Sequence, residues 1–454
     1  MLLLPLLLAA QAVAPPARAT AVQAGAVSVQ AAVDAAAPGD TVRLGSGIHQ
    51  GPVVIAKPLT LLGMPGATLD GGRRGTVLTV RADSVVIEGL VLTGSGRSLD
   101  RDEAAIRLEE CTGCRISGST ITEPLHGIYL LRSQGVTIER NEITGSAALE
   151  EPLRGNGIHL FSSSGNRIAG NRIRSTRDGI YFSFASGNRV VDNDVSGVRY
   201  GLHYMYSDDN VFERNRFTRN AAGAAIMFSK RITLRENTFS RHVGYRAYGI
   251  LLQTGEDIVA ERNRIEGNLT GLFLDGAVRN VFRENVVSGN GVGIDLLASA
   301  EDNLFTRNVI ADNRIPVRKV LGTGRNAWDD GRAGNFWNDA AVFDLDGDGI
   351  GDRPYRVGDT WASLAATRPS LELFGGTLAA RALGWAEEAF PVFDVPRVED
   401  ERPLASAPAA PATAADASPP ATHPIRKAGL LVALLVTYGG GAGLLRRRTL
   451  RRAA

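Results

Sequence analysis

The hydrophobic positions of this chain recur with a fixed period through its middle part. A glycine followed by an aliphatic residue marks each recurrence, and the aliphatic residues are Ile128, Ile158, Ile180, Leu202, Ala224, Ile250, Leu272 and Ile294. The steps between them are 30, 22, 22, 22, 26, 22 and 22 residues, so two steps carry insertions, one of them around residues 145–153. A constant period of this size with short alternating runs predicts a solenoid of repeats.

Asparagines recur in phase with this pattern. They lie at Asn141, Asn171, Asn193, Asn215, Asn237, Asn263, Asn285 and Asn308. Asparagine suits turns because it tolerates the left-handed backbone conformation, and stacked amides can bond to one another as a ladder. The pattern therefore predicts an all-β, right-handed parallel β-helix, a single-stranded solenoid of about ten coils of 22 residues stacked about 4.8 Å apart.

The solenoid needs a cap at each end, because its terminal coils would otherwise expose unpaired strand edges. We expect an N-terminal helical cap at 27–36 within a cap and first coil spanning 20–63. The repeats then occupy 64–315, and an irregular C-terminal cap spans 316–400. That last region holds all four tryptophans, Trp328, Trp337, Trp361 and Trp385.

The two ends of the chain predict export and anchoring. Residues 1–19 form a short apolar stretch that ends in an Ala-x-Ala cleavage signal before Thr20. An Ala/Pro-rich linker, 401–427, cannot bury a core. Residues 428–445 carry no charge over eighteen positions and predict a transmembrane helix. The arginine-rich tail 446–454 predicts that this end lies in the cytoplasm.

Composition narrows the class of partner. The formal net charge is +2 and 22% of the residues are charged, which argues against a nucleic-acid partner. Two cysteines are too few for a disulfide framework.

The period fixes the direction of each side chain on the repeated strand. The aliphatic column begun by Ile128 points inward, and so does the column two residues further on, which includes Tyr204. The column between them points outward and contains Tyr129, His159, Tyr181, His203, Ala225, Leu251, Phe273 and Asp295. Met205 and Met227 share the next outward column, and we expect Tyr206 to point inward.

His203, Met205 and Met227 are therefore expected on one outer face. Thioether and imidazole ligands suit Cu(I), and the strand and coil spacings would let three such ligands converge on one ion. The alternative is an apolar and aromatic stripe that another protein covers. His159 lies in the same outward column and belongs to the same candidate surface. Both alternatives, transient copper ligation and docking, remain open on the sequence.

Two other groups of residues are candidates for metal binding or redox chemistry. Cys111 and Cys114 form a C-x-x-C pair at a coil turn, which predicts a local disulfide, an idle thiol pair, or a soft-metal or redox site. The run 344–352 places Asp344, Asp346 and Asp348 at positions 1, 3 and 5 of a calcium loop, and Asp352 at position 9. Position 12 is Tyr355 rather than glutamate, so a structural calcium ion and a metal-free turn are both open.

Several blocks of the chain resemble the NosD family of nitrous-oxide-reductase maturation proteins. The repeats, GLHYMYSDDN (201–210), GNFWNDAAVFDLDGDGIGDRPY (334–355) and FPVFDVPRVEDERPL (390–404) carry the resemblance, which runs from about 27 to 404. The repeats alone are shared with other β-helix proteins, whereas the other blocks are more specific.

The resemblance implies a periplasmic, non-enzymatic accessory protein that helps assemble the copper–sulfide cluster of nitrous oxide reductase. The implied partners are an ABC transporter permease and its ATPase, a copper chaperone and the reductase. With the C-terminal helix, this predicts a docking platform held at the inner membrane. The alternative class is a carbohydrate-active β-helix enzyme, a lyase or epimerase, for which Asp275 and Asp295 are the main outward carboxylates on the repeated strand.

Overall fold

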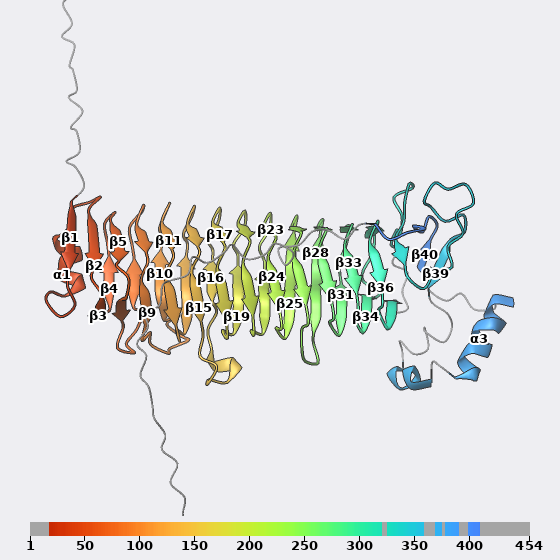
Figure 1. Ribbon diagram of the computed structural model, residues 1–454, viewed down its shortest axis with the longest axis horizontal. Coiled ribbons are helices and arrows are strands. Elements are labelled where there is room, and N and C mark those ends of the chain that lie inside the picture. Colours follow the sequence, from red (N-terminus) through yellow and green to blue (C-terminus); the bar gives the residue numbers. More distant parts are fainter. Residues whose placement is uncertain (1–17, 320–324, 358–367, 375–376, 390–397, 409–454) are drawn as a thin grey trace, which may run out of the picture. The chain divides into compact units, whose positions relative to one another are not determined.

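The protein, described here from a computed structural model, is a parallel β-helix. The structure describes residues 18–319, 325–357, 368–374, 377–389 and 398–408. Each coil contributes one short strand to each of three parallel sheets, and successive coils pair side by side (Figure 1). The predicted all-β, right-handed solenoid is confirmed.

The three sheets, named A, B and C, contain 13, 13 and 12 strands in the part that the structure describes. Sheet A consists of β1 (Ala19–Val22), β2 (Thr41–Leu44), β5 (Thr60–Gly63), β8 (Val86–Glu88), β11 (Arg115–Ser117), β14 (Thr137–Glu139), β17 (Arg167–Ala169), β20 (Arg189–Val191), β23 (Val211–Glu213), β26 (Thr233–Arg235), β29 (Val259–Glu261), β32 (Val281–Arg283) and β35 (Leu304–Thr306). Sheet B consists of β3 (Gly47–Gln50), β6 (Ala67–Asp70), β9 (Val91–Thr93), β12 (Thr120–Thr122), β15 (Glu142–Thr144), β18 (Arg172–Arg174), β21 (Asp194–Ser196), β24 (Arg216–Thr218), β27 (Thr238–Ser240), β30 (Arg264–Glu266), β33 (Val286–Ser288), β36 (Val309–Ala311) and β38 (Phe336–Trp337). Sheet C consists of β4 (Val53–Ile55), β7 (Leu78–Val80), β10 (Ala104–Glu109), β13 (His126–Leu131), β16 (Ile158–Phe161), β19 (Asp178–Ser183), β22 (Tyr200–Met205), β25 (Ala222–Lys230), β28 (Tyr248–Glu256), β31 (Thr270–Asp275), β34 (Val292–Leu296) and β37 (Ile315–Lys319).

The solenoid is longer than the ten predicted coils. The first coils, β1 to β9, and the last strands, β35 to β38, belong to the same sheets as the repeats. Strands β2 to β5 lie in the range 20–63 predicted for the cap and first coil, and β6 to β36 lie within the predicted repeats 64–315, so the additional coils come from strands that lack the glycine–aliphatic pair.

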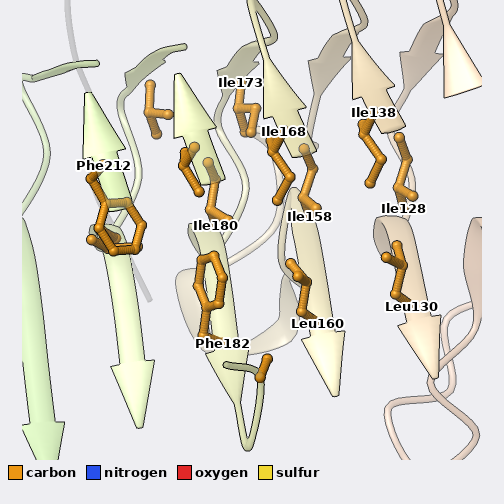
Figure 2. Close-up of a cluster of buried hydrophobic side chains, with 14 of the residues drawn as sticks. Ile128, Leu130, Ile138, Ile158, Leu160, Ile168, Ile173, Ile180, Phe182 and Phe212 are labelled. Carbon is orange, nitrogen blue, oxygen red and sulfur yellow. The ribbon is translucent and has the colours of Figure 1, made fainter. Parts of the chain in front are cut away.

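The interior consists of rows of aliphatic and aromatic side chains that run from coil to coil. Figure 2 shows two such rows on sheet C, one through Ile128, Ile158 and Ile180 and the other through Leu130, Leu160 and Phe182. All six side chains are fully buried. Each buried side chain of this size contributes about 1.5–3 kcal/mol through removal of its surface from water. The predicted inward register is confirmed.

A ladder of buried asparagines fixes one turn of each coil from Asn141 to Asn335. Asn193 shows the pattern: its side-chain amide donates to the Oδ1 atom of Asn215 at 2.9 Å, and its backbone N–H donates to the same oxygen at 3.0 Å. The same pair of bonds recurs along Asn141, Asn171, Asn193, Asn215, Asn237, Asn263, Asn285, Asn308 and Asn335. The asparagine side chains therefore bond to the backbone N–H groups that have no strand partner at the turn.

A second ladder contains one histidine in place of asparagine. His242 lies between Asn220 and Asn268, and its Nδ1 atom accepts the backbone N–H of Asn220 at 3.2 Å. Its own backbone N–H donates to Asn268 at 3.1 Å. The Nε2 atom of His242 is buried without a hydrogen-bond partner. Burial lowers the pKa of this imidazole to about 3.

The N-terminal cap is the helix α1 (Val29–Ala35), within the predicted range 27–36. Ser28 begins it, since its hydroxyl accepts the backbone N–H of Ala31 at 3.1 Å. Val29, Ala32 and Val33 are buried. The strand β1 precedes the helix, and the predicted cleavage before Thr20 would leave all of that strand but Ala19.

The C-terminal cap contains η2 (Pro369–Phe374), α3 (Leu378–Ala389) and the antiparallel pair β39 (Tyr355–Val357) and β40 (Val398–Asp400). The asparagine ladder ends here, because the Oδ2 atom of Asp400 accepts the backbone N–H of Asn335 at 2.7 Å. The same oxygen accepts the indole N–H of Trp337 at 2.8 Å. Asp400 is fully buried.

The cap also includes residues that the sequence assigned to the linker 401–427. Gly334 donates its backbone N–H to the carbonyl of Arg402 at 2.7 Å, and Leu404 donates to Asn335 at 2.9 Å. Further main-chain bonds join Gly351 to Pro403 and Ala405 to Gly349. The linker prediction is therefore wrong for 401–405. These residues bond to the cap through backbone groups, which amino-acid composition does not reveal.

The other predictions for the two ends of the chain fall outside the described residues. These are the signal segment up to residue 17, the linker from 409, the span 428–445 and the tail 446–454. Of the helices that the structure describes, none is long and apolar enough to cross a membrane.

Replacing His242 by asparagine should flatten the dependence of stability on pH. The folded-state pKa lies below the ordinary 6.5, so this histidine's contribution is complete above pH 6.5 and is lost as pH falls toward 3. For a neutral buried imidazole the loss is about 2 kcal/mol at pH 5 relative to pH 8. His242→Asn removes this loss and restores the amide that the neighbouring rungs carry.

Urea unfolding at pH 8 and at pH 5 measures the difference, with Asn268→His as the reciprocal variant that should steepen the dependence. Equal losses in the wild type and in His242→Asn would show that the imidazole does not titrate as described.

A chain cut after residue 408 should fold, whereas one cut after residue 400 should be less stable. The second cut removes four main-chain hydrogen bonds, at 2.7–2.9 Å, that hold 402–405 in the cap. At about 1 kcal/mol each, the expected loss is about 4 kcal/mol. Gel filtration and thermal melting of the two proteins test this. Aggregation of the longer one would mean that residues after 408 are part of the fold.

Candidate functional site

A row of alternating histidines and tyrosines lies on the outer face of sheet C. The strand register places Tyr129, His159, Tyr181 and His203 on four consecutive coils, as predicted. Their ring centroids are 4.4, 4.5 and 4.7 Å apart in that order. His126 adjoins this row, with its ring centroid 5.4 Å from that of His159.

Much of this outward row is not exposed, contrary to expectation. Tyr129 is only 4% exposed and His126 only 3%. Asp102, from the loop before β10, lies against both side chains, with 3.9 Å between its Oδ1 atom and the Nε2 atom of His126. Burial, and then the Asp102 carboxylate, raise the pKa of Tyr129. Pointing out of the barrel is therefore not the same as reaching solvent.

His159 is covered from the other side. The insertion at 145–157, which contains η1 (Glu151–Leu153), places the side chain of Asn156 3.3 Å from the Nδ1 atom of His159. The Nε2 atom of His159 has no contact with solvent and no hydrogen-bond partner. Burial lowers the pKa of this imidazole well below 6.5, and the charges of His126 and Arg177 act in the same direction. The ring of Tyr181 stands between His159 and His203, so His159 lies outside the ligand group of His203.

His203 is held by a buried carboxylate. Its Nδ1 atom lies 2.9 Å from the Oδ2 atom of Asp178, which is fully buried. Arg199 binds both oxygens of that carboxylate, at 2.8 and 2.7 Å. Burial alone would raise the pKa of Asp178, but the hydrogen bonds from His203 and Arg199 outweigh it and lower the pKa to about 2.

This arrangement fixes which nitrogen of His203 is available. An ionised carboxylate only accepts hydrogen bonds, so Nδ1 carries the proton and donates it to Asp178. In the neutral ring the lone pair is then on Nε2. A histidine whose other nitrogen is bonded to a carboxylate is the arrangement that orients imidazole ligands toward metals in proteins.

Met205 and Met227 are neighbours on consecutive coils, as predicted. They pair directly in the register of β22 with β25, and both are partly exposed. The Sδ atom of Met205 lies 4.0 Å from the hydroxyl of Tyr181. Two thioethers beside an imidazole form a soft donor set that suits Cu(I). The residue types present therefore fit copper, although the same face also fits a protein partner.

An exposed stack of aromatic rings adjoins the methionines. Phe184, Tyr206 and Phe228 are 56, 48 and 40% exposed, with adjacent ring centroids 5.3 and 5.1 Å apart and ring planes within 13° of parallel. The prediction that Tyr206 points inward is wrong. Its φ of 50° places it in a left-handed turn, where strict strand alternation has ended. The 22-residue spacing of these three aromatics was visible in the sequence but was not used.

Three aromatic residues with positive φ are costly, because bulky side chains rarely adopt this conformation. Asparagine or glycine would relieve the cost at each turn. Arg132, Ser162 and Thr254 adopt the same conformation at the equivalent turns of neighbouring coils, so the turn imposes it and the aromatic residues are what distinguishes these three coils.

The two cysteines are joined by a disulfide. Cys111 and Cys114 are both buried in the hydrophobic core. Of the alternatives raised by the sequence, this is the local disulfide, and it leaves no thiol for a metal.

The acidic loop brings three of its four predicted ligands together. Ligand oxygens of Asp344, Asp346 and Asp348 lie within 4.8 Å of one another. Among the described residues, no other trio of His, Cys, Asp or Glu does so. Asp352 does not belong to the group, and its carboxylate accepts the backbone N–H of Leu345 at 2.7 Å. Tyr355 is also occupied, donating its hydroxyl to Asp339 at 2.6 Å.

The carboxylates expected for a sugar-cleaving site are engaged elsewhere. Asp295 is 2% exposed and is paired with Arg318 at 2.5 Å. Asp275 accepts the hydroxyl of Ser299 at 3.0 Å. The outer face of sheet C thus offers imidazole, thioether and aromatic groups around His203, whereas these two carboxylates do not face each other as a pair.

Known proteins resemble this chain in sequence and in fold. A family model described as "Periplasmic copper-binding protein (NosD)" matches residues 140–341. A relative from Pseudomonas aeruginosa, named "Probable ABC transporter binding protein NosD", is 39% identical over 382 residues, which cover 81% of this chain and 88% of the relative. A relative of the same name from Stutzerimonas stutzeri is 37% identical, with 81% and 87% covered.

Among solved structures, the catalytic domain of a GH87 alpha-1,3-glucanase matches with a TM-score of 0.55 and 14% identity, covering 72% of this chain and 70% of that domain. At this identity the likeness concerns the β-helix fold alone.

Calcium should raise the melting temperature if Asp344, Asp346 and Asp348 bind it. A ligand that binds only the folded state at 100 times its Kd stabilises by about 2.7 kcal/mol. Thermal melting of the purified protein with millimolar calcium and with EDTA measures the effect. Asp346→Asn should abolish it, whereas Asp352→Asn should keep it, since Asp352 lies outside the cluster. A melting curve that calcium leaves unchanged would make the loop a metal-free turn.

Proposed function

This chain belongs to the NosD family, and on that premise we propose that it is a periplasmic accessory protein for the maturation of nitrous oxide reductase. In this role it serves as a docking platform between an ABC transporter, a copper chaperone and the reductase. It brings the partners of copper–sulfide cluster assembly together rather than catalysing a reaction.

The platform is the outer face formed by His203, Met205 and Met227 with the aromatic stack of Phe184, Tyr206 and Phe228. The observation that carries the proposal is the directly paired Met205 and Met227 beside a histidine whose Nδ1 is already bonded to Asp178. Aromatic residues and methionine are also the residue types enriched at protein interfaces. The copper chaperone is the partner that we assign to this face.

Cu(I) is the cargo in this proposal. His203 Nε2 and the thioethers of Met205 and Met227 would hold it while the chaperone is docked, and Asp178 with Arg199 would keep the imidazole in the competent tautomer. The proposal extends to the transporter permease and its ATPase. The span 428–445 would place this chain in the same membrane as the permease. That span and the inner-membrane anchorage remain predictions from the sequence.

Docking and copper ligation are separable by substitution. Met205→Leu and Met227→Leu keep the apolar area but remove the sulfur, so together they should abolish Cu(I) ligation and leave docking intact. Tyr206→Asn removes an exposed ring and suits the left-handed turn, so it should weaken docking alone. Tyr204→Ala is the stability control, since loss of this fully buried ring should cost about 3–5 kcal/mol.

Two measurements decide between these roles. Competition with a chromogenic Cu(I) chelator under anaerobic conditions gives copper affinity, and nitrous oxide reductase activity in complemented cells gives maturation. Loss of both with the leucine pair supports ligation, and loss of maturation with Tyr206→Asn alone supports docking. Full maturation with the leucine pair, with Tyr206→Asn and with His203→Ala would refute the platform.

A further inference from the structure

A separate hollow lies on the outer face of sheet B. It encloses about 510 Å³ and runs across β24, β27, β30 and β33. No residue of the platform on sheet C lines it. None of the motifs singled out in the sequence accounts for this hollow.

The register gives the hollow the form of a trough along the solenoid. Arg216 and Arg264 occupy one outward row, two coils apart. Arg219 and Arg241 form the next outward row. They lie directly after β24 and β27, in left-handed turns with φ of 53° and 56°. Between the two sets lies a floor row of three hydroxyl residues and one carboxylate, in the order Thr218, Ser240, Glu266 and Ser288. Guanidinium groups therefore flank a floor that can both donate and accept hydrogen bonds.

Three of these arginines lack a counterion. Arg216, Arg219 and Arg241 are exposed, and none forms an ion pair or a side-chain hydrogen bond with any residue that the structure describes. On the adjoining sheet A, in contrast, arginines reach glutamates on neighbouring coils: Arg189 binds Glu213, and Arg235 and Arg283 bind Glu261. These three arginines of the trough therefore carry uncompensated positive charge among the described residues, whereas the arginines on sheet A are paired with glutamates.

Two carboxylates also line the trough. Glu266 lies on its middle coil, paired with Arg264 at 2.7 Å, and Asp312 lies at the far end, one coil beyond Gly289. A uniformly charged polymer such as a polyuronate or a nucleic acid would place anions against these carboxylates. A peptide can instead present acidic residues to Arg216, Arg219 and Arg241 and neutral or basic residues to Glu266 and Asp312.

We propose that this trough binds an extended acidic segment of a partner protein. Guanidinium groups bind carboxylates through two parallel hydrogen bonds, and the hydroxyl floor offers partners to a peptide backbone. The rows from Arg216 to the level of Asp312 span four coil steps, about 19 Å, which an extended peptide of about six residues matches. The trough is a second docking site, and it does not depend on copper or on the platform.

The test uses the full-length protein in detergent and the fluorescein-labelled peptide Glu-Glu-Ser-Glu-Gly-Ser. Fluorescence anisotropy at low salt should show saturable binding. The double variant Arg219→Asn/Arg241→Asn should bind roughly tenfold more weakly, from two exposed charge pairs. Asparagine tolerates the left-handed turn, so the backbone should keep its conformation.

The matched control is Arg214→Asn/Arg231→Asn. These arginines also have positive φ, 51° and 53°, and the same charge is lost, but they pair with Asp192 and Asp209 at other corners. Binding should be unchanged in the control, which excludes a general effect of net charge. Arg216→Gln, on the opposite wall, should weaken binding as well, which covers the case in which the double variant folds poorly.

Three results would overturn the proposal. One is the absence of saturable peptide binding. Another is equal weakening in the trough and control variants. The third is tighter binding of an oligogalacturonate than of the peptide, with sensitivity to Arg219 and Arg241, which would make the trough a saccharide site. None of these results affects the copper measurements on the platform.

Discussion

The asparagine ladder is the interaction on which this structure depends. Each buried amide donates to the next rung and accepts from the previous one. One asparagine therefore provides hydrogen-bond partners for backbone N–H groups at a turn, where no neighbouring strand is available. A buried amide with either bond missing would cost about 1–3 kcal/mol, and the cost would recur at each coil. A slip of one coil against the next by a single residue breaks the ladder and turns the core column outward at the same time. The ladder thus fixes the register on which each outer surface depends.

The last rung of this ladder, Asn335, still donates and needs an acceptor beyond the final coil. Asp400 meets that requirement, since its carboxylate receives N–H groups from Asn335 and Trp337. This explains why a segment 65 residues away in sequence returns to the last coil. It also explains why the chain just after Asp400 pairs with the cap instead of starting the linker.

The sequence was sufficient for whatever depends on the repeat itself. The period of 22 placed His203, Met205 and Met227 on one face, and the strand pairs agree residue by residue. It was not sufficient where a side chain's surroundings come from outside its own coil. Tyr129 and His159 point outward as predicted but are covered by Asp102 and Asn156, from loops whose fold the period does not describe. Tyr206 was misplaced for a different reason, since strand alternation ends at the left-handed turn that follows Met205.

The two outer faces belong to the same coils. His203 and Met205 lie on β22 and Arg216 and Arg219 follow in β24 and its turn, so one passage of the chain around the barrel carries part of each site. Between them lie fully buried side chains such as Tyr204, Phe212 and Phe217. A close-packed core of this kind does not deform continuously, and the ladder does not allow the coils to slide. The solenoid is therefore suited to holding two partners at a fixed separation rather than to signalling between them, which is the property that a docking platform requires.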